Sequence, residues 1–108
     1  MQRADALVLE IGGDVGALVV YTDATCAGAE LDLAPAGSPR SHDLHNVVRS
    51  RTTGAGETVF AAVFPQVREG RYTLWGVDGT GPVAEVAVLG GAVSEAHAGC
   101  CRGPRSCI

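Results

Sequence analysis

The side chains best suited to binding a metal ion gather near the C-terminus of the chain. They are His97, Cys100, Cys101 and Cys107, and thiolates with an imidazole form a ligand set for a soft ion such as Zn(II) or Cu(I). The spacing lacks the Cys-x2-Cys pair of many zinc sites, and adjacent cysteines do not easily direct both sulfurs at one ion. Cys26 would then have to complete the site. The segment predicts either a small metal site or an unstructured tail of reduced thiols.

A second group of polar residues alternates along 42–51, a segment with the two-residue period of a β-strand. Leu44 and Val48 fall on one face of this predicted strand. The polar residues on the other face are Asp43, His45, Arg49 and Arg51. Such a face could bind a carboxylate or a phosphate. The alternative is a solvated strand face with a cross-strand ion pair, which would contribute little.

Trp75 extends this candidate patch. It has the same parity as Arg71 and Thr73, which should point outward from their strand. An exposed tryptophan near arginine would be a stacking platform for a ligand or a protein partner. The alternative is that a loop covers the ring. The predicted binding patch therefore comprises His45, Arg49, Arg51 and Trp75.

Catalytic machinery is not visible in the sequence. No Gly-x-Ser-x-Gly turn occurs, no nucleophile stands near a plausible base, and no carboxylates have a useful spacing. We therefore predict a non-catalytic binding or structural module, whose partner is another protein or a small ligand. The alternatives are a small protein that binds Zn or Cu through its tail and, last, a hydrolase.

Composition narrows the partners and the environment. The 108 residues carry a formal net charge of -4, and all basic residues are arginine. An acidic domain without a basic stripe is not expected to bind nucleic acid or an anionic membrane. Neither a signal-like apolar segment nor a run long enough to span a bilayer is visible. These features predict a cytoplasmic protein with reduced cysteines.

Regularly spaced Gly and Pro residues predict a single all-β domain of seven or eight mostly antiparallel strands, in a sandwich or a barrel. Of the two we expect an antiparallel β-sandwich with a Greek-key, immunoglobulin-like order. The expected strands are 6–11, 17–21, 30–33, 42–51, 58–64, 71–75, 83–89 and 92–94, with a hairpin turn at Asp78-Gly79. The strand 6–11 or 30–33 could pair copies of the chain edge to edge. The sandwich should span 1–95. The Cys/Gly/Arg-rich tail 96–108 should be irregular, and its composition also fits a frameshifted end with no selected role.

The most informative local pattern is a corner between two strands. Phe64 should end a buried strand, and Val67 should fold back to plug the end of the sandwich. Gly70 supplies a backbone conformation that a side chain would oppose. Tyr72 then points inward, where its hydroxyl can bond to a backbone group.

This corner resembles that of prealbumin-like sandwiches, which include Cna-B repeats, transthyretin-like domains and carboxypeptidase regulatory domains. The segments 12–21, 60–65 and 72–75 are also similar to a family of small uncharacterised actinobacterial proteins, some of which carry the label phospholipase. The resemblance implies a fold and not a function. The isopeptide bond of Cna-B domains needs a lysine, which this chain lacks. The chain also lacks the C-terminal Tyr-Arg-Gly-Ser of transthyretin-like hydrolases.

Overall fold

A computed structural model describes residues 11–41, 43–76 and 82–98 of the chain. Eight strands and one short 3-10 helix, η1, follow one another along these residues. In order they are β1 (Val15–Thr22), η1 (Ala24–Cys26), β2 (Glu30–Pro35), β3 (Leu44–Val47), β4 (Arg49–Thr52), β5 (Thr58–Arg68), β6 (Gly70–Trp75), β7 (Pro82–Val88) and β8 (Val93–His97). None of the described residues forms a helix with the length and apolar content needed to cross a membrane.

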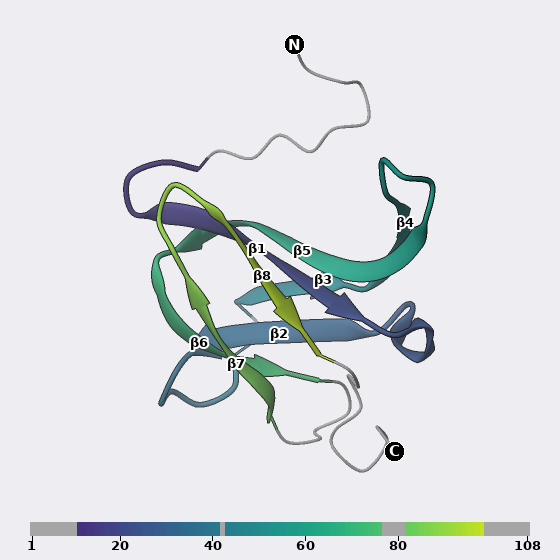
Figure 1. The fold of residues 1–108 in the computed structure, drawn as a ribbon. Helices are drawn as coiled ribbons and strands as arrows, with labels where there is room; N and C mark the ends of the chain where they lie inside the picture. Colours follow the sequence, from purple (N-terminus) through teal and green to yellow (C-terminus); the bar gives the residue numbers. More distant parts are fainter. Residues whose placement is uncertain (1–10, 42, 77–81, 99–108) are drawn as a thin grey trace.

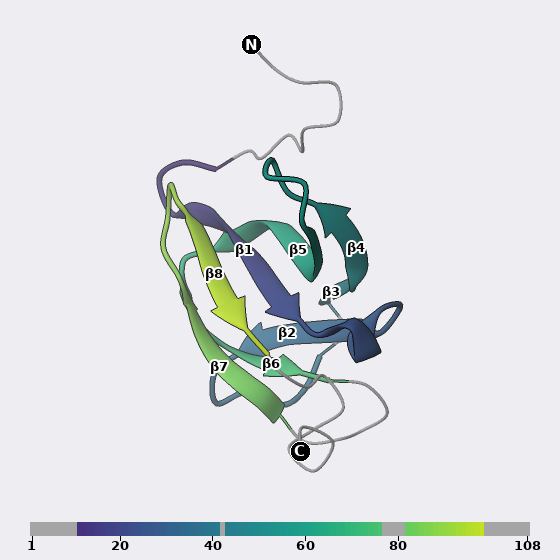
Figure 2. The same ribbon diagram turned by 45° about the vertical axis from the view of Figure 1, so that its right-hand side comes forward.

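The strands form two four-stranded sheets that pack as the layers of a sandwich (Figures 1 and 2). Sheet A has the order β4-β5-β1-β8, and sheet B has the order β3-β2-β6-β7. The predicted all-β sandwich is therefore confirmed. Sheet A is mixed rather than antiparallel, because β8 runs parallel to β1 after the chain has crossed from sheet B.

The core lies between the sheets and follows from the alternation in each strand. Leu18 and Val20 of β1 face Leu31 and Leu33 of β2 and Leu74 of β6, and all five are fully buried. Each such side chain contributes about 1.5–3 kcal/mol through its removal from water. This apolar layer fixes which residues of every strand face outward.

The segment 42–51 is not the single strand that its alternation predicts. It divides into β3, in sheet B, and β4, in sheet A. The division falls at Val48, which is buried and bonded to the two residues before β2: its N–H donates to Ala29 O (2.9 Å), and its carbonyl accepts from the Gly28 N–H (2.8 Å). The next residue, Arg49, already pairs with Ala61 in sheet A.

The corner before β6 contains the expected hydrogen bond, but the strand that precedes the corner, β5, is longer than predicted. The Tyr72 hydroxyl donates to the carbonyl of Arg68 (2.6 Å), and Gly70 has a φ of +154°. Burial raises the pKa of Tyr72, while the neighbouring Arg68 lowers it to a smaller extent. Phe64 and Val67 are both in the core, but neither ends a strand, because β5 continues to Arg68.

The C-terminal strand is longer than predicted. β8 ends at His97, beyond the predicted strand 92–94 and two residues past the predicted domain limit at 95. The N–H of Ala98 then bonds to Tyr21 O (2.8 Å), so Ala98 is still part of the packed domain. Of the predicted strand 6–11, only residue 11 is among the described residues. The predicted hairpin turn at Asp78-Gly79 and the tail from 99 onward lie outside them. β6 and β7 do pair as an antiparallel hairpin.

Candidate binding surface

The structure brings two of the four predicted patch residues onto one face. On the outer face of sheet B, Asp32 of β2 pairs with His45 of β3 on one side and with Trp75 of β6 on the other. The three residues therefore form one row across the sheet. His45 is also 3.7 Å from a carboxylate oxygen of Glu30, measured from its Nε2.

The loop between β2 and β3 covers this row. Arg40 of the loop donates from Nε to the carboxylate of Asp32 (2.8 Å) and from Nη2 to Gly76 O. Its guanidinium carbon lies 5.9 Å from the centre of the Trp75 ring. The Asp32 side chain is only 2% exposed, so the arginine both pairs a buried carboxylate and covers the tryptophan. Trp75 is therefore not an open stacking platform.

The indole N–H of Trp75 is buried without a hydrogen-bond partner among the described residues. Nothing in the sequence pattern indicated Asp32 or Arg40, because their pairing joins a strand to a loop eight residues away. The row of His45, Asp32 and Trp75 is a packed polar cluster. Within the described residues, its contacts with Arg40 attach the loop to sheet B.

Arg49 and Arg51 lie on the other sheet, so the predicted patch is divided. Both are on β4, and the Nε of Arg51 donates to Ala61 O (3.2 Å). Arg49 is exposed and forms no ion pair within the described residues. The reason for the division is the break at Val48, which sends β3 and β4 into different layers.

Of the predicted metal ligands, only His97 lies within the described residues. Its ring stacks on Tyr21, with 5.2 Å between the ring centres. The Tyr21 hydroxyl donates to Glu95 (3.2 Å), and burial, followed by that carboxylate, raises the pKa of Tyr21. His97 is on the outer face of sheet A, whereas His45 is on the outer face of sheet B, so these two histidines do not converge. The described residues contain no group of three side chains that could hold a metal ion.

Cys26 is disulfide-bonded, which corrects the expectation of reduced thiols for this residue. It is fully buried at the end of η1, where its sulfur lies 3.6 Å from a carboxylate oxygen of Asp23. Asp23 caps the helix by accepting from the Thr25 N–H (3.1 Å). A sulfur held in a disulfide is not available as a thiolate ligand. The other cysteines of the chain, Cys100, Cys101 and Cys107, lie outside the described residues.

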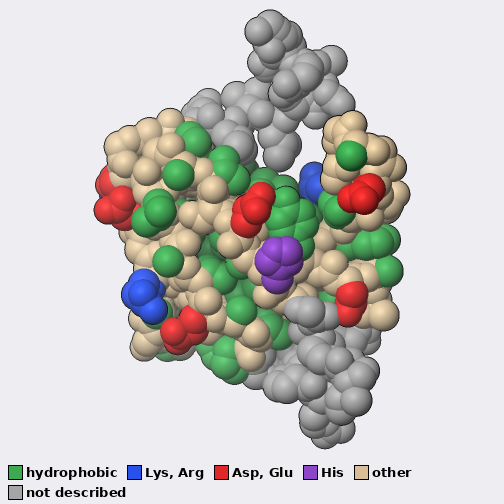
Figure 3. Space-filling view, in the orientation of Figure 1, with side chains coloured by type: hydrophobic (Ala, Val, Ile, Leu, Met, Phe, Trp, Pro, Cys, Tyr) green, Lys and Arg blue, Asp and Glu red, His purple; other side chains and the backbone are tan. Residues whose placement is uncertain are grey.

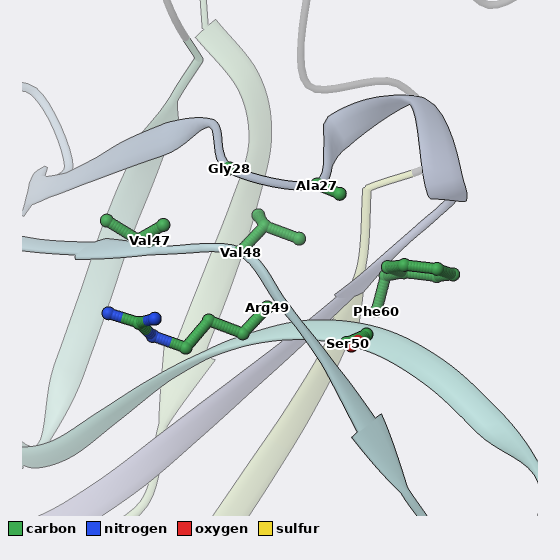
Figure 4. Close-up of a pocket in the computed structure, with 7 residues that line it drawn as sticks. All are labelled: Ala27, Gly28, Val47, Val48, Arg49, Ser50 and Phe60. Carbon is green, nitrogen blue, oxygen red and sulfur yellow. The ribbon is translucent and has the colours of Figure 1, made fainter.

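A hollow of about 460 Å³ opens where the chain crosses from β3 to β4 (Figure 4). Its walls come from the end of η1, the crossing itself, β4 and β5. The lining residues are Ala27, Gly28, Val47, Val48, Arg49, Ser50 and Phe60. In Figure 4 the Phe60 ring lies on one side, and the Arg49 side chain extends away from it on the other. The hollow is open to solvent, and apolar side chains share its lining with polar groups.

The strand beside this hollow lies at the edge of its sheet. Among the described residues, β4 is the last strand of sheet A and has β5 as its one neighbour. At the hairpin end, the Thr53 N–H donates to Glu57 O (2.8 Å). Because hydrogen-bonded and non-bonded pairs alternate in an antiparallel ladder, the backbone N–H and C=O of Ser50 and Thr52 point away from β5. Ser50 pairs with Phe60, and its side chain shares the face of the hollow.

Comparisons of the chain with family models, with curated proteins and with solved structures find no match.

The face of the molecule in Figure 3 shows acidic side chains scattered between apolar ones, with few basic side chains and no large patch of one charge among the coloured residues. The edge of β4 and the adjoining hollow form one continuous surface. We name this surface the β4 edge; it comprises Arg49, Ser50, Arg51, Thr52 and the hollow.

Proposed function

We propose that this domain is a non-catalytic binding module that takes up an extended segment of a protein partner at the β4 edge. The segment would add a fifth strand to sheet A. One observation carries the proposal: backbone groups of β4 that no other described strand pairs with lie directly beside an open hollow, one wall of which is the Phe60 ring.

Strand addition uses these two features together. Backbone hydrogen bonds supply affinity in this mode, and pockets for alternate side chains supply specificity. Ser50 and Thr52 offer the backbone groups, while the hollow beside Phe60 offers room for one apolar side chain of the partner. The volume of this hollow is within the usual range of ligand pockets, so it has room for one side chain of a partner.

A proline at Ser50 tests the proposal without breaking the sheet. Because the Ser50 N–H points away from β5, Ser50→Pro removes no bond of the β4–β5 ladder, and proline is tolerated in this edge position. Arg49, which would precede the proline, already has the extended conformation that this position needs. Ser50→Ala is the matched control, since it keeps the N–H and removes only the hydroxyl.

Seven-residue peptides selected on the wild-type domain from a random displayed library are the probes. We expect them to bind Ser50→Ala as they bind the wild type, and to bind Ser50→Pro at least about tenfold more weakly. Thermal unfolding should show that both variants are folded. Equal binding to Ser50→Pro, or the failure of the library to yield any binding peptide, would overturn the proposal.

We also propose kinship with the prealbumin-like sandwiches and the small actinobacterial family. The Tyr72 corner and the two four-stranded layers support it. A cytoplasmic location stays a prediction, although the reduced cysteines expected to follow from it are not found at Cys26. Metal binding by the tail also stays a prediction.

A further inference from the structure

The charges at the β4 edge specify the partner more closely. We infer that the segment it binds is acidic, with two carboxylate side chains flanking one apolar side chain. This inference rests on the proposed strand addition and adds the chemistry of the partner. It starts from the faces of β4: Ser50 pairs with Phe60, and Arg49 and Arg51 pair with Ala61 and Val59.

An added strand must continue this alternation. The partner residue opposite Ser50 points to the side of Phe60 and faces the hollow, where Val48 and Phe60 offer an apolar side chain contact area. The residues before and after it point to the other face of sheet A, next to Arg49 and Arg51. The favoured pattern is therefore acidic, apolar, acidic.

Arg49 and Arg51 differ in how firmly they are held. The Nε of Arg51 is bonded to Ala61 O, which keeps its guanidinium near the edge. Arg49 has no ion pair within the described residues, so a carboxylate of a partner would replace only water. The nearest acidic residue on this hairpin, Glu57, is at its far end, opposite Thr53, and forms no ion pair among the described residues.

The same charges disfavour a second copy of the chain as the occupant. If β4 paired with β4 of another molecule, Arg49 and Arg51 of one copy would face those of the other, and like charges opposite each other destabilise a sheet. The predicted pairing through 30–33 is also excluded, because β2 has neighbours on both sides. The observations therefore favour an acidic segment of a different protein.

Two defined peptides test the inference. One is Ser-Thr-Glu-Leu-Glu-Thr-Ser, and its counterpart has lysine in place of both glutamates. Dissociation constants are measured by NMR titration of the whole chain at low and at high salt. The variant is Arg49→Glu with Arg51→Glu; the control is Arg71→Glu, which changes an exposed arginine on β6, outside the β4 edge.

For the wild type and Arg71→Glu, we expect the glutamate peptide to bind about five- to tenfold more tightly than the lysine peptide at low salt, and less so at high salt. The double variant should reverse this preference. If binding is sensitive to Ser50→Pro but both peptides bind equally, the acidic partner is wrong and strand addition stands. If neither peptide binds in a way that Ser50→Pro removes, both this inference and the proposed function fail.

Discussion

The chain crosses between the two sheets from β7 to β8 and from β3 to β4, and these two crossings are packed differently. From β7 to β8, the turn is packed tightly against the start of β1. The Gly91 N–H donates to Val15 O (2.9 Å), the Ala17 N–H donates to Ala92 O (3.0 Å), and a Cβ placed on Gly16 would lie 2.2 Å from Leu89 O. No further side chain fits there.

From β3 to β4, the chain crosses with only Val48 buried at the transition, and the hollow remains beside it. On the β4–β5 hairpin, a Cβ placed on Gly54 would have no other atom within 4 Å. The comparison indicates that the backbone itself closes one crossing, whereas the other leaves room that a partner can fill.

The largest effect is expected at Cys26, which ends the helix that forms the rim of the open crossing. Cys26→Ala removes a disulfide and a fully buried side chain, and should lower the free energy of unfolding by about 2–5 kcal/mol. Denaturant unfolding with and without a reductant measures this. Reduction should destabilise the wild type much more than Cys26→Ala; an equal effect on both would contradict the role of this disulfide.

The tight crossing is tested by Gly16→Ala. Since the new methyl group meets backbone atoms, which cannot rotate away, the free energy of unfolding should fall by about 2–3 kcal/mol. Gly54→Ala, in the exposed turn between β4 and β5, is the control and should be neutral or stabilising by up to about 1 kcal/mol. Equal losses for the two variants would contradict a tightly packed crossing at Gly16.

The Tyr72 corner belongs to neither crossing and is a reference for both. Tyr72→Phe removes the bond to Arg68 O and should cost about 1 kcal/mol. Burial raises the pKa of Tyr72 above its ordinary value of 10.0, so the folded state favours the neutral phenol. The resulting stability is fully present below pH 10.0 and is lost as the pH rises through the folded-state pKa.

Unfolding measured from pH 8 to pH 11 (roughly the range that brackets a tyrosine pKa) should therefore show a smaller alkaline decline for Tyr72→Phe than for the wild type. Tyr21, whose pKa is also raised, remains in both proteins and leaves a residual decline. Identical declines would contradict a buried neutral phenol. Binding at the β4 edge should be unchanged in this variant.

Most strands could be predicted because their two-residue alternation reflects a half-buried sheet. This is true of β2 and β6, where apolar residues recur on one parity, whereas β1 was predicted from its continuous apolar run. The corner was predictable because Gly70 and Tyr72 act within one short segment. In these segments, the spacing of residues within a short stretch of sequence was enough to predict the local structure.

The binding surface could not be predicted in the same way. Alternation continues through Val48 although the chain changes sheets there, so the pattern placed His45 and Arg49 on one face that the fold divides. The parallel partner of β8 and the pairing of Arg40 with Asp32 depend on residues that only the folded chain brings together. A short sequence pattern does not contain such long-range contacts.

The most direct test of the open β4 edge is residue-resolved amide hydrogen exchange of the whole chain, with and without the glutamate peptide. The amides of Ser50 and Thr52 should exchange rapidly in the free protein and become protected when the peptide is bound. Those of Arg49 and Arg51, bonded to β5, should be slower in both states. Slow exchange of Ser50 and Thr52 in the free protein, or no protection on peptide binding, would contradict an edge that is free to accept a partner strand.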